Sequence, residues 1–73
     1  MNMIILGKAI KRFREKKGLS QDVLSGLAGM NRSYLSEIEN GRYNLTVMVL
    51  YKLADALEVR TSDILRAAEE MTE

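Results

Sequence analysis

The stretch QDVLSGLAGMNRSYLSEIEN, residues 21–40, decides the fold of this chain. Its two halves carry apolar residues at helical spacing: Val23, Leu24, Leu27 and Ala28 in the first, and Leu35 and Ile38 in the second. Gly29 lies between the halves, and glycine is the residue that most readily adopts the left-handed backbone of a tight turn. Two short helices joined by such a turn make a helix-turn-helix. The pattern therefore predicts this motif, with its second helix over about residues 31–40.

The residues before and within the motif predict where its helices begin and end. Leu6, Ala9, Ile10 and Phe13 recur on one face of a helix over about residues 3–17, which ends at Gly18. Ser20 and Asn31 are the expected N-caps of the two motif helices, because their side-chain oxygens can accept from free backbone N–H groups. We interpret Gly26, beside Ser25, as room for a closely crossing helix.

Two more helices are predicted after the motif. Thr46 is expected to cap a helix that ends at Leu57 and turns Val47, Leu50, Leu53, Ala54 and Leu57 inward. Thr61 is expected to cap a last helix over about residues 62–70. No stretch alternates as a strand would. The sequence therefore predicts one all-α domain, residues 1–73, with five helices and a core over about residues 6–65.

Composition excludes several classes of function. The chain has 73 residues without Cys or His, so we expect no disulfide, no metal and no cofactor. The usual general base and thiol nucleophile are also missing, which argues against an enzyme. No apolar run approaches the ~18 residues of a membrane span, and no signal peptide is present, so we expect a cytoplasmic protein. A core this small supplies about 3–5 kcal/mol, which favours a homodimer.

Charge is divided unevenly along the chain. Residues 1–44 hold eight Lys or Arg and four Asp or Glu, whereas residues 45–73 hold three and six. A basic first half suits a polyanion such as DNA, and an acidic second half suits solvent or a protein partner. A scatter of solvated charges is the plainer interpretation.

Four linked motifs indicate a family: KKGLSQ, the turn with LAG, RSYLSEIENGRYN, and LADALEV. With these motifs the chain resembles the lambda-repressor/Cro-like helix-turn-helix (XRE) family over about residues 6–65. The resemblance implies a sequence-specific transcription regulator that binds double-stranded DNA at a two-fold-related operator as a homodimer. The segment NRSYLSEIENGRYNLT is also similar to the controller proteins of restriction-modification systems. The alternatives are an antitoxin, a phage-type repressor, or a protein-interaction module that does not bind DNA.

The second motif helix would enter the major groove, and its outward face holds the expected base contacts. These are Arg32, Ser33, Ser36 and Glu37. Arg32 can donate two hydrogen bonds to guanine, and by resemblance its position is a base reader. It could instead bind a phosphate or be solvated, and Ser33 could be merely exposed. Glu37 could accept from cytosine N4, pair with an arginine such as Arg32, or remain solvated.

Residues around this face are expected to contact phosphates. They are Gln21, Asn31, Tyr34, Asn40, Arg42, Tyr43 and Asn44. For Tyr34 the alternative is packing against the core, and for residues 42–44 it is ordinary turn chemistry. By resemblance, Arg14 and Glu39 form an ion pair beneath the recognition helix.

The dimer is expected to form through the last two helices, where apolar residues exceed the needs of one core. The expected interface is Tyr51, Val59, Ile64, Leu65 and Ala68. Alternatively, Ile64 and Leu65 simply close the core of the single chain. Whether RNA polymerase is also a partner does not follow from the sequence.

Overall fold

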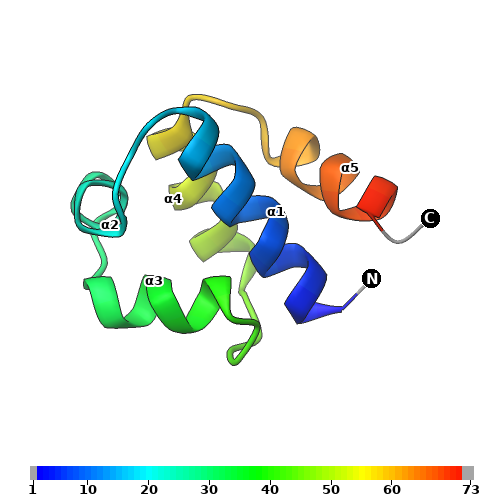
Figure 1. The fold of residues 1–73 in the computed structure, drawn as a ribbon, viewed down its shortest axis with the longest axis horizontal. Helices are drawn as coiled ribbons and strands as arrows, with labels where there is room; N and C mark the ends of the chain where they lie inside the picture. Colours follow the sequence, from blue (N-terminus) through cyan, green and yellow to red (C-terminus); the bar gives the residue numbers. More distant parts are fainter. Residues whose placement is uncertain (1, 72–73) are drawn as a thin grey trace.

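The computed structural model describes residues 2–71 and contains five helices in this range, with no strand. They are α1 (Met3–Lys16), α2 (Gln21–Ala28), α3 (Arg32–Glu39), α4 (Val47–Leu57) and α5 (Thr61–Met71). The predicted all-α, five-helix fold is therefore confirmed. In Figure 1, α1 crosses the middle of the molecule, with α2 and α3 toward the left and α5 toward the right.

The core lies around α1, which contacts α3, α4 and α5, while α2 packs between α3 and α4. Its fully buried large side chains come from all five helices: Ile10, Leu24, Leu35, Ile38, Leu53, Leu57 and Ile64. Each helix thus contributes one apolar stripe to a single interior. This packing holds α3 against the core by one face and leaves its opposite face at the surface.

Side-chain caps set the starts of four helices. Ser20 Oγ accepts from Val23 N–H at 3.1 Å, Asn31 Oδ1 from Tyr34 at 2.8 Å and Thr46 Oγ1 from Val49 at 3.1 Å. These three caps were predicted. Asn2 adds a fourth, since its Oδ1 accepts from Ile5 N–H at 2.9 Å. Each cap satisfies a backbone donor that has no partner within its helix.

The cap predicted for the last helix is wrong. Thr61 is already inside α5. Ahead of it, Arg60 N–H donates to Asp63 Oδ2 at 2.9 Å, and the Arg60 carbonyl accepts from Asp63 N–H. The carboxylate of Asp63 therefore reaches back to the residue that begins the helix, a role that its position three residues later allows.

Three residues expected to point inward are exposed. Val23, Leu27 and Val47 have 48%, 62% and 65% of their surface accessible. α2 has only eight residues and packs through Leu24, Ser25 and Ala28, so the neighbouring flank is left outside. Apolar spacing identified these helices correctly, but the buried stripes of α2 and α4 are narrower than the spacing predicted.

The close helix crossing lies at Gly7, not at Gly26. A Cβ at Gly26 would meet nothing within 4 Å. A Cβ at Gly7 would instead press on the carbonyl oxygen of Ile38 and lie 2.7 Å from that of Glu39. The C-terminal end of α3 thus rests directly on the backbone of α1, and the interpretation of Gly26 as the crossing point is wrong.

Candidate nucleic-acid interface

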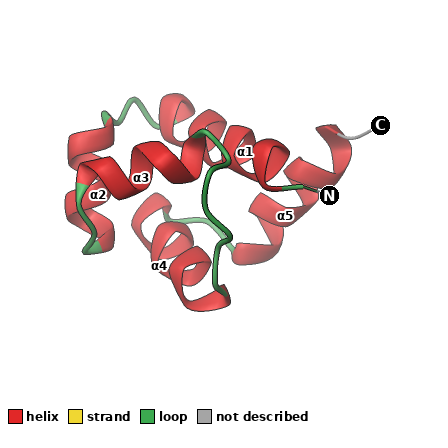
Figure 2. Ribbon diagram, turned by 90° about the horizontal axis from the view of Figure 1, so that it is seen from below, coloured by secondary structure: helices red, strands yellow, loops and turns green. Residues whose placement is uncertain are grey.

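The turn between α2 and α3 fixes how the second motif helix is presented. Gly29 caps α2 in the left-handed conformation at φ 72°, as its place in the sequence predicts. Met30 N–H donates to the Ser25 carbonyl at 2.9 Å, which closes the turn. Asn31 then caps α3. Figure 2 shows α3 and the loop after it on the surface nearest the viewer.

The outward face of α3 brings the four predicted base-contact residues together. Arg32, Ser33, Ser36 and Glu37 line one shallow hollow. Arg32 and Ser33 are exposed, whereas Ser36 and Glu37 are half-buried. The hollow joins guanidinium donors, hydroxyls and a carboxylate acceptor, which are the groups that read base edges.

The charged ends of this face are each paired across to another element. Arg32 Nε lies 3.6 Å from Asp22 Oδ1 on α2, and Glu37 Oε2 lies 3.5 Å from Arg42 Nη1 in the following loop. Glu37 therefore pairs with an arginine, as one of the interpretations from the sequence allows. The partner is Arg42 and not Arg32. Both pairs are open to solvent, so they add little to stability. They bias the orientation of Arg32 and Glu37 without locking either side chain.

A second hollow shares Ser33 and Glu37 with the first and extends to Tyr43 in the loop after α3. Asn31, Ser33, Tyr34, Glu37 and Tyr43 line it. The rings of Tyr34 and Tyr43 are 5.5 Å apart at a tilt of 55°. Tyr34 is half-buried against the core, and Tyr43 is 51% exposed. Tyr34 thus packs partly against the core, and its phosphate contact stays a prediction, while Tyr43 in the loop remains accessible.

A buried ion pair holds α3 from below. Arg14 Nε donates to Glu39 Oε2 at 2.7 Å, and Arg14 Nη2 donates to Glu39 Oε1 at 3.0 Å. Arg14 Nη1 donates to the Leu19 carbonyl at 2.8 Å. The hydrogen bond to Glu39 is the main cause that raises the pKa of Arg14. The structure therefore contains the ion pair expected from the resemblance, with every guanidinium nitrogen engaged.

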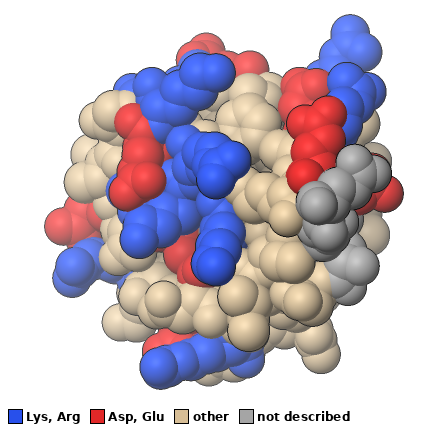
Figure 3. Space-filling model, turned by 45° about the vertical axis from the view of Figure 1, so that its right-hand side comes forward, with Lys and Arg blue, Asp and Glu red and all other residues tan. Residues whose placement is uncertain are grey.

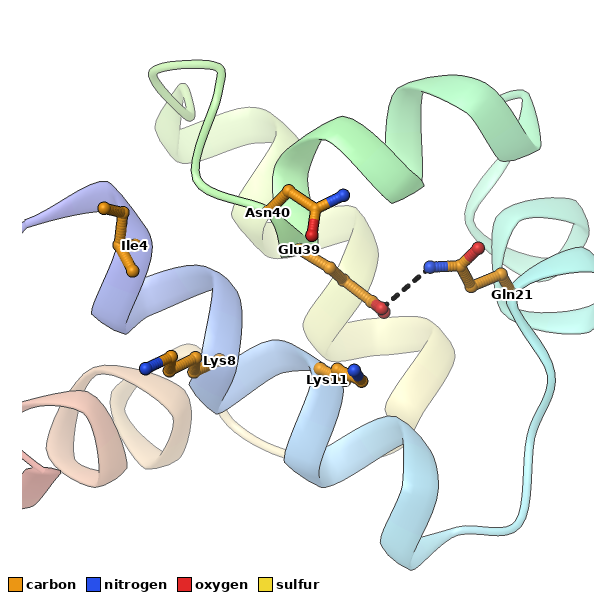
Figure 4. A pocket seen from close by; sticks show the side chains of 6 residues that line it. All are labelled: Ile4, Lys8, Lys11, Gln21, Glu39 and Asn40. Atoms are coloured by element: carbon orange, nitrogen blue, oxygen red, sulfur yellow. Dashed lines mark hydrogen bonds between the residues drawn. The ribbon is translucent and has the colours of Figure 1, made fainter.

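Gln21 joins this network, because its Nε2 donates to Glu39 Oε1 at 3.0 Å (Figure 4). Its side chain is thus already committed to α3, whereas the sequence suggested that it reaches a phosphate. Lys8 and Lys11 of α1 lie near Gln21 of α2, although the sequence did not mark these two lysines as site residues. With Ile4, Gln21, Glu39 and Asn40 they line one hollow.

Basic side chains lie close together on part of the surface. Figure 3 shows several Lys and Arg side chains side by side near the centre of the view, with Asp and Glu side chains next to them. Lys8 and Lys11 are exposed and three residues apart on α1, so they share one helix face. Their spacing was visible in the sequence. Their position beside the end of α3 was not, since it depends on how α1 crosses that helix.

Two of the residues expected in a dimer interface belong to the core. Ile64 and Ala68 are 0% exposed, so they have no surface to offer a partner, and this expectation is wrong. Val59 and Leu65 are half-buried, and Tyr51 is 51% exposed. α4 exposes two further apolar residues, Val47 and Met48. α4 therefore exposes three large apolar side chains on one helix, and α2 exposes two, Val23 and Leu27.

Neither metal-binding groups nor membrane helices occur in the described part of the chain. Residues 2–71 include no cluster of three or more Asp, Glu, His or Cys side chains arranged to hold a metal ion. None of the helices in that range is both long and apolar enough to cross a bilayer.

Comparison with known proteins gives consistent matches. A family model described as helix-turn-helix matches residues 10–64. An uncharacterised helix-turn-helix-type transcriptional regulator of Sinorhizobium fredii is 38% identical over 66 residues, which cover 90% of this chain and 86% of that protein. Other curated relatives are longer: the chain spans 41% of the immunity repressor of Bacillus phage phi105 and 46% of a Bacillus subtilis regulator.

Two solved structures are also similar. The clp gene regulator of Corynebacterium glutamicum aligns with a TM-score of 0.94 and 30% identity, over 97% of this chain and 92% of that one. The restriction-modification controller protein of Aeromonas hydrophila aligns with a TM-score of 0.83 and 34% identity, over 85% of this chain and 94% of that one.

Proposed function

The chain belongs to the helix-turn-helix family of DNA-binding transcriptional regulators, and we propose that it reads a two-fold-related operator as a homodimer. In this proposal α3 of each subunit enters the major groove of one half-site. Residues 1–73 act as a single DNA-binding domain with its core over about residues 6–65, working in the cytoplasm. The observation that carries the proposal is the hollow on the outward face of α3, where a guanidinium, two hydroxyls and a carboxylate converge.

Each residue of that hollow has a base partner that suits its chemistry. Arg32 donates to guanine O6 and N7, and Glu37 accepts from cytosine N4. Ser33 and Ser36 are small enough to let the helix approach and carry hydroxyls for either donor or acceptor edges. The pairing of Glu37 with Arg42 supports this assignment, because a nearby guanidinium offsets the repulsion between the carboxylate and phosphates.

Phosphate contacts are assigned to the rim of the hollow, on both sides of the groove. One side consists of Asn31, Tyr34, Arg42, Tyr43 and Asn44, and the other of Gln21, Asn40 and the two lysines of α1, Lys8 and Lys11. We assign the backbone N–H of Gln21 to the phosphate, since its side chain donates to Glu39. These contacts position α3 without reading sequence.

The dimer is assigned to the exposed side of α4 with its neighbours. Val47, Met48 and Tyr51 form an accessible apolar surface, and Val59 and Leu65 are half-buried. Two recognition helices must lie about 34 Å apart to read adjacent major grooves on one side of the duplex. A small apolar surface on a chain of this size suits a weak dimer, whose DNA occupancy rises with protein concentration.

The physiological role that we assign is autoregulation of a restriction-modification system. It is supported by the similarity to the controller protein of Aeromonas hydrophila and by the motif between residues 31 and 46. The similarity to a phage immunity repressor favours phage-type repression as the second candidate. Duplexes selected from a random pool, compared with the promoter beside the gene itself, separate autoregulation from control of another promoter.

The direct test measures binding to the selected duplex by fluorescence anisotropy at two salt concentrations. Neutralising about 6–10 phosphates lowers affinity by about 10³–10⁵ between 50 and 200 mM salt. Affinity that does not depend on salt would contradict DNA binding and favour the protein-interaction module.

The base-contact assignment is tested with Arg32→Ala, which should lose ~1–3 kcal/mol on the selected site and relax preference at one base pair. Arg66→Ala removes another exposed arginine, on α5, and serves as the matched control. Equal weakening on selected and random duplexes would refute Arg32 as a base reader.

The dimer assignment is tested with Tyr51→Glu and by lengthening the spacer between half-sites. The substitution should shift sedimentation equilibrium toward monomer and weaken binding to the full operator more than to a half-site. Inserting about half a DNA turn, or roughly five base pairs, should abolish the advantage of the full operator. An unchanged advantage would mean that subunits bind independently.

A further inference from the structure

An acidic residue stands where the proposed function predicts DNA. Asp22 is the second residue of α2, and its side chain is 78% exposed beside Arg32, the first residue of α3. A carboxylate on a DNA-facing surface is repelled by phosphates. Asp22 does suit the N-terminal end of α2, where negative charge is favoured. That local role does not require a guanidinium 3.6 Å away on the next helix.

The contact between Asp22 and Arg32 involves the part of the guanidinium that is not needed to bind a base. Asp22 Oδ1 approaches Nε of Arg32, on the side edge of the planar group. The two terminal nitrogens remain available at the far edge, and together they match guanine O6 and N7. At 3.6 Å the contact is an ion pair without a hydrogen bond, so it biases the side chain without locking it.

From this geometry, and resting on the proposed function, we propose that Asp22 is a positioning residue that orients Arg32 for guanine. The turn centred on Gly29 brings the two residues together, so selectivity at this base pair depends on a side chain outside the recognition helix. Affinity for guanine increases because an arginine side chain that is already oriented loses less conformational freedom on binding. Shielding from solvent in the complex strengthens the attraction between the two charges.

Two other roles for Asp22 make different predictions. If Asp22 only repels phosphates, its neutralisation should tighten binding to every duplex alike. If Asp22 itself accepts a hydrogen bond from a cytosine, its neutralisation should relax preference at a base pair different from the one that Arg32 reads. A positioning role predicts loss at the same base pair for both residues.

The experiment titrates the selected duplex and its three single-base variants at the guanine that Arg32→Ala identifies. The proteins are the full chain and its variants Asp22→Asn, Asp22→Glu, Arg32→Ala and the double variant Asp22→Asn/Arg32→Ala. Glu70→Gln removes one exposed negative charge from α5 and is the matched control. Thermal unfolding of each variant verifies that the fold is retained.

We expect Asp22→Asn to weaken binding to the guanine duplex by roughly 2- to 10-fold, the equivalent of ordering one long side chain. The three variant duplexes should change as little as they do with Glu70→Gln. Asp22→Glu should retain most of the preference, and Asp22→Asn should add nothing once Arg32 is absent. Such non-additivity is the signature of residues that act through one another.

Two outcomes overturn the proposal while leaving the proposed function intact. One is relaxation of guanine preference by Arg32→Ala but not by Asp22→Asn. The other is an equal gain in affinity for all four duplexes with Asp22→Asn. If Arg32→Ala itself leaves base preference unchanged, the assignment of Arg32 as a base reader fails, and the role of Asp22 fails with it.

Discussion

Two glycines inside helices should respond in opposite ways to the same substitution. Alanine normally stabilises a helix interior relative to glycine by about 0.5–1 kcal/mol. Gly26→Ala in α2 should show this gain, because a Cβ there meets nothing within 4 Å. Gly7→Ala in α1 should instead destabilise the protein, since the new Cβ presses on the backbone of α3 at Ile38 and Glu39.

The size of the Gly7→Ala effect follows from the displacement that it requires. A Cβ would lie 2.7 Å from the carbonyl oxygen of Glu39 and closer still to that of Ile38, and ordinary contact begins near 3.4 Å, so α1 and α3 must separate by more than about 0.7 Å. The same movement stretches the 2.7 Å hydrogen bond between Arg14 and Glu39. Overpacking of this kind costs about 1–3 kcal/mol, a large part of the ~3–5 kcal/mol expected for a domain of this size.

Urea unfolding followed by circular dichroism measures both variants against the unmodified chain. Gly26→Ala should raise the midpoint and Gly7→Ala should lower it, with unchanged slopes. Because α3 would also shift, Gly7→Ala should weaken operator binding even where the protein remains folded. If Gly7→Ala stabilised the chain as much as Gly26→Ala, the close approach of α1 and α3 would be refuted.

Three further predictions concern ion pairs and one strained residue. Glu39→Leu leaves Arg14 buried without its carboxylate and should cost about 3–5 kcal/mol, which is as much as the whole stability expected for the domain. Circular dichroism should therefore show Glu39→Leu largely unfolded without urea, whereas adding Arg14→Met should restore most of the folded signal. If the double variant were no more stable than Glu39→Leu, the loss would not come from an unpaired charge. Glu58 has a left-handed backbone at φ 60°, so Glu58→Gly should raise the thermal midpoint by a few degrees, and a lower midpoint would mean that its side-chain contact matters more. Lys17 lowers the pKa of Glu58 by donating a 2.9 Å hydrogen bond to its carboxylate. The pair therefore stabilises the fold fully at pH values above the ordinary carboxyl pKa, and this stabilisation is lost as the pH falls through the lowered pKa of Glu58. The stability difference between the chain and Lys17→Gln should therefore vanish in acid, and a difference that persists there would exclude the carboxylate as its source.

The fold was largely predictable because its signals are local. Caps such as Ser20, Asn31 and Thr46 act on N–H groups three residues away, and Gly29 sets its own turn. Such features need no knowledge of the rest of the molecule. The predictions that failed need it: whether Val47 or Ile64 is covered depends on which helices lie over each flank.

In the candidate site, too, the local features could be predicted from the sequence and the contacts between elements could not. Steps of 100° per residue place Arg32 and Glu37 outside the buried stripe of α3, and the structure agrees. Their ionic partners could not be predicted, because Asp22 and Arg42 reach them only through the turn and the loop that flank α3. Lys8 and Lys11 join the site for a similar reason: the crossing at Gly7 sets α1 beside the end of α3.

The way in which α3 is held has a consequence for how specificity can change. Its inner side is fixed by Leu35 and Ile38 in the core and by Glu39, whose carboxylate accepts from two different helices. The backbone of the recognition helix is therefore ordered before DNA arrives, so binding has mainly side chains to order. None of the four residues of the outward hollow takes part in that support. Substitutions at those four positions should therefore change which operator sequence the protein prefers while its stability stays nearly constant. Substitutions of the residues that hold the inner side of α3 should change both the preferred operator and the stability.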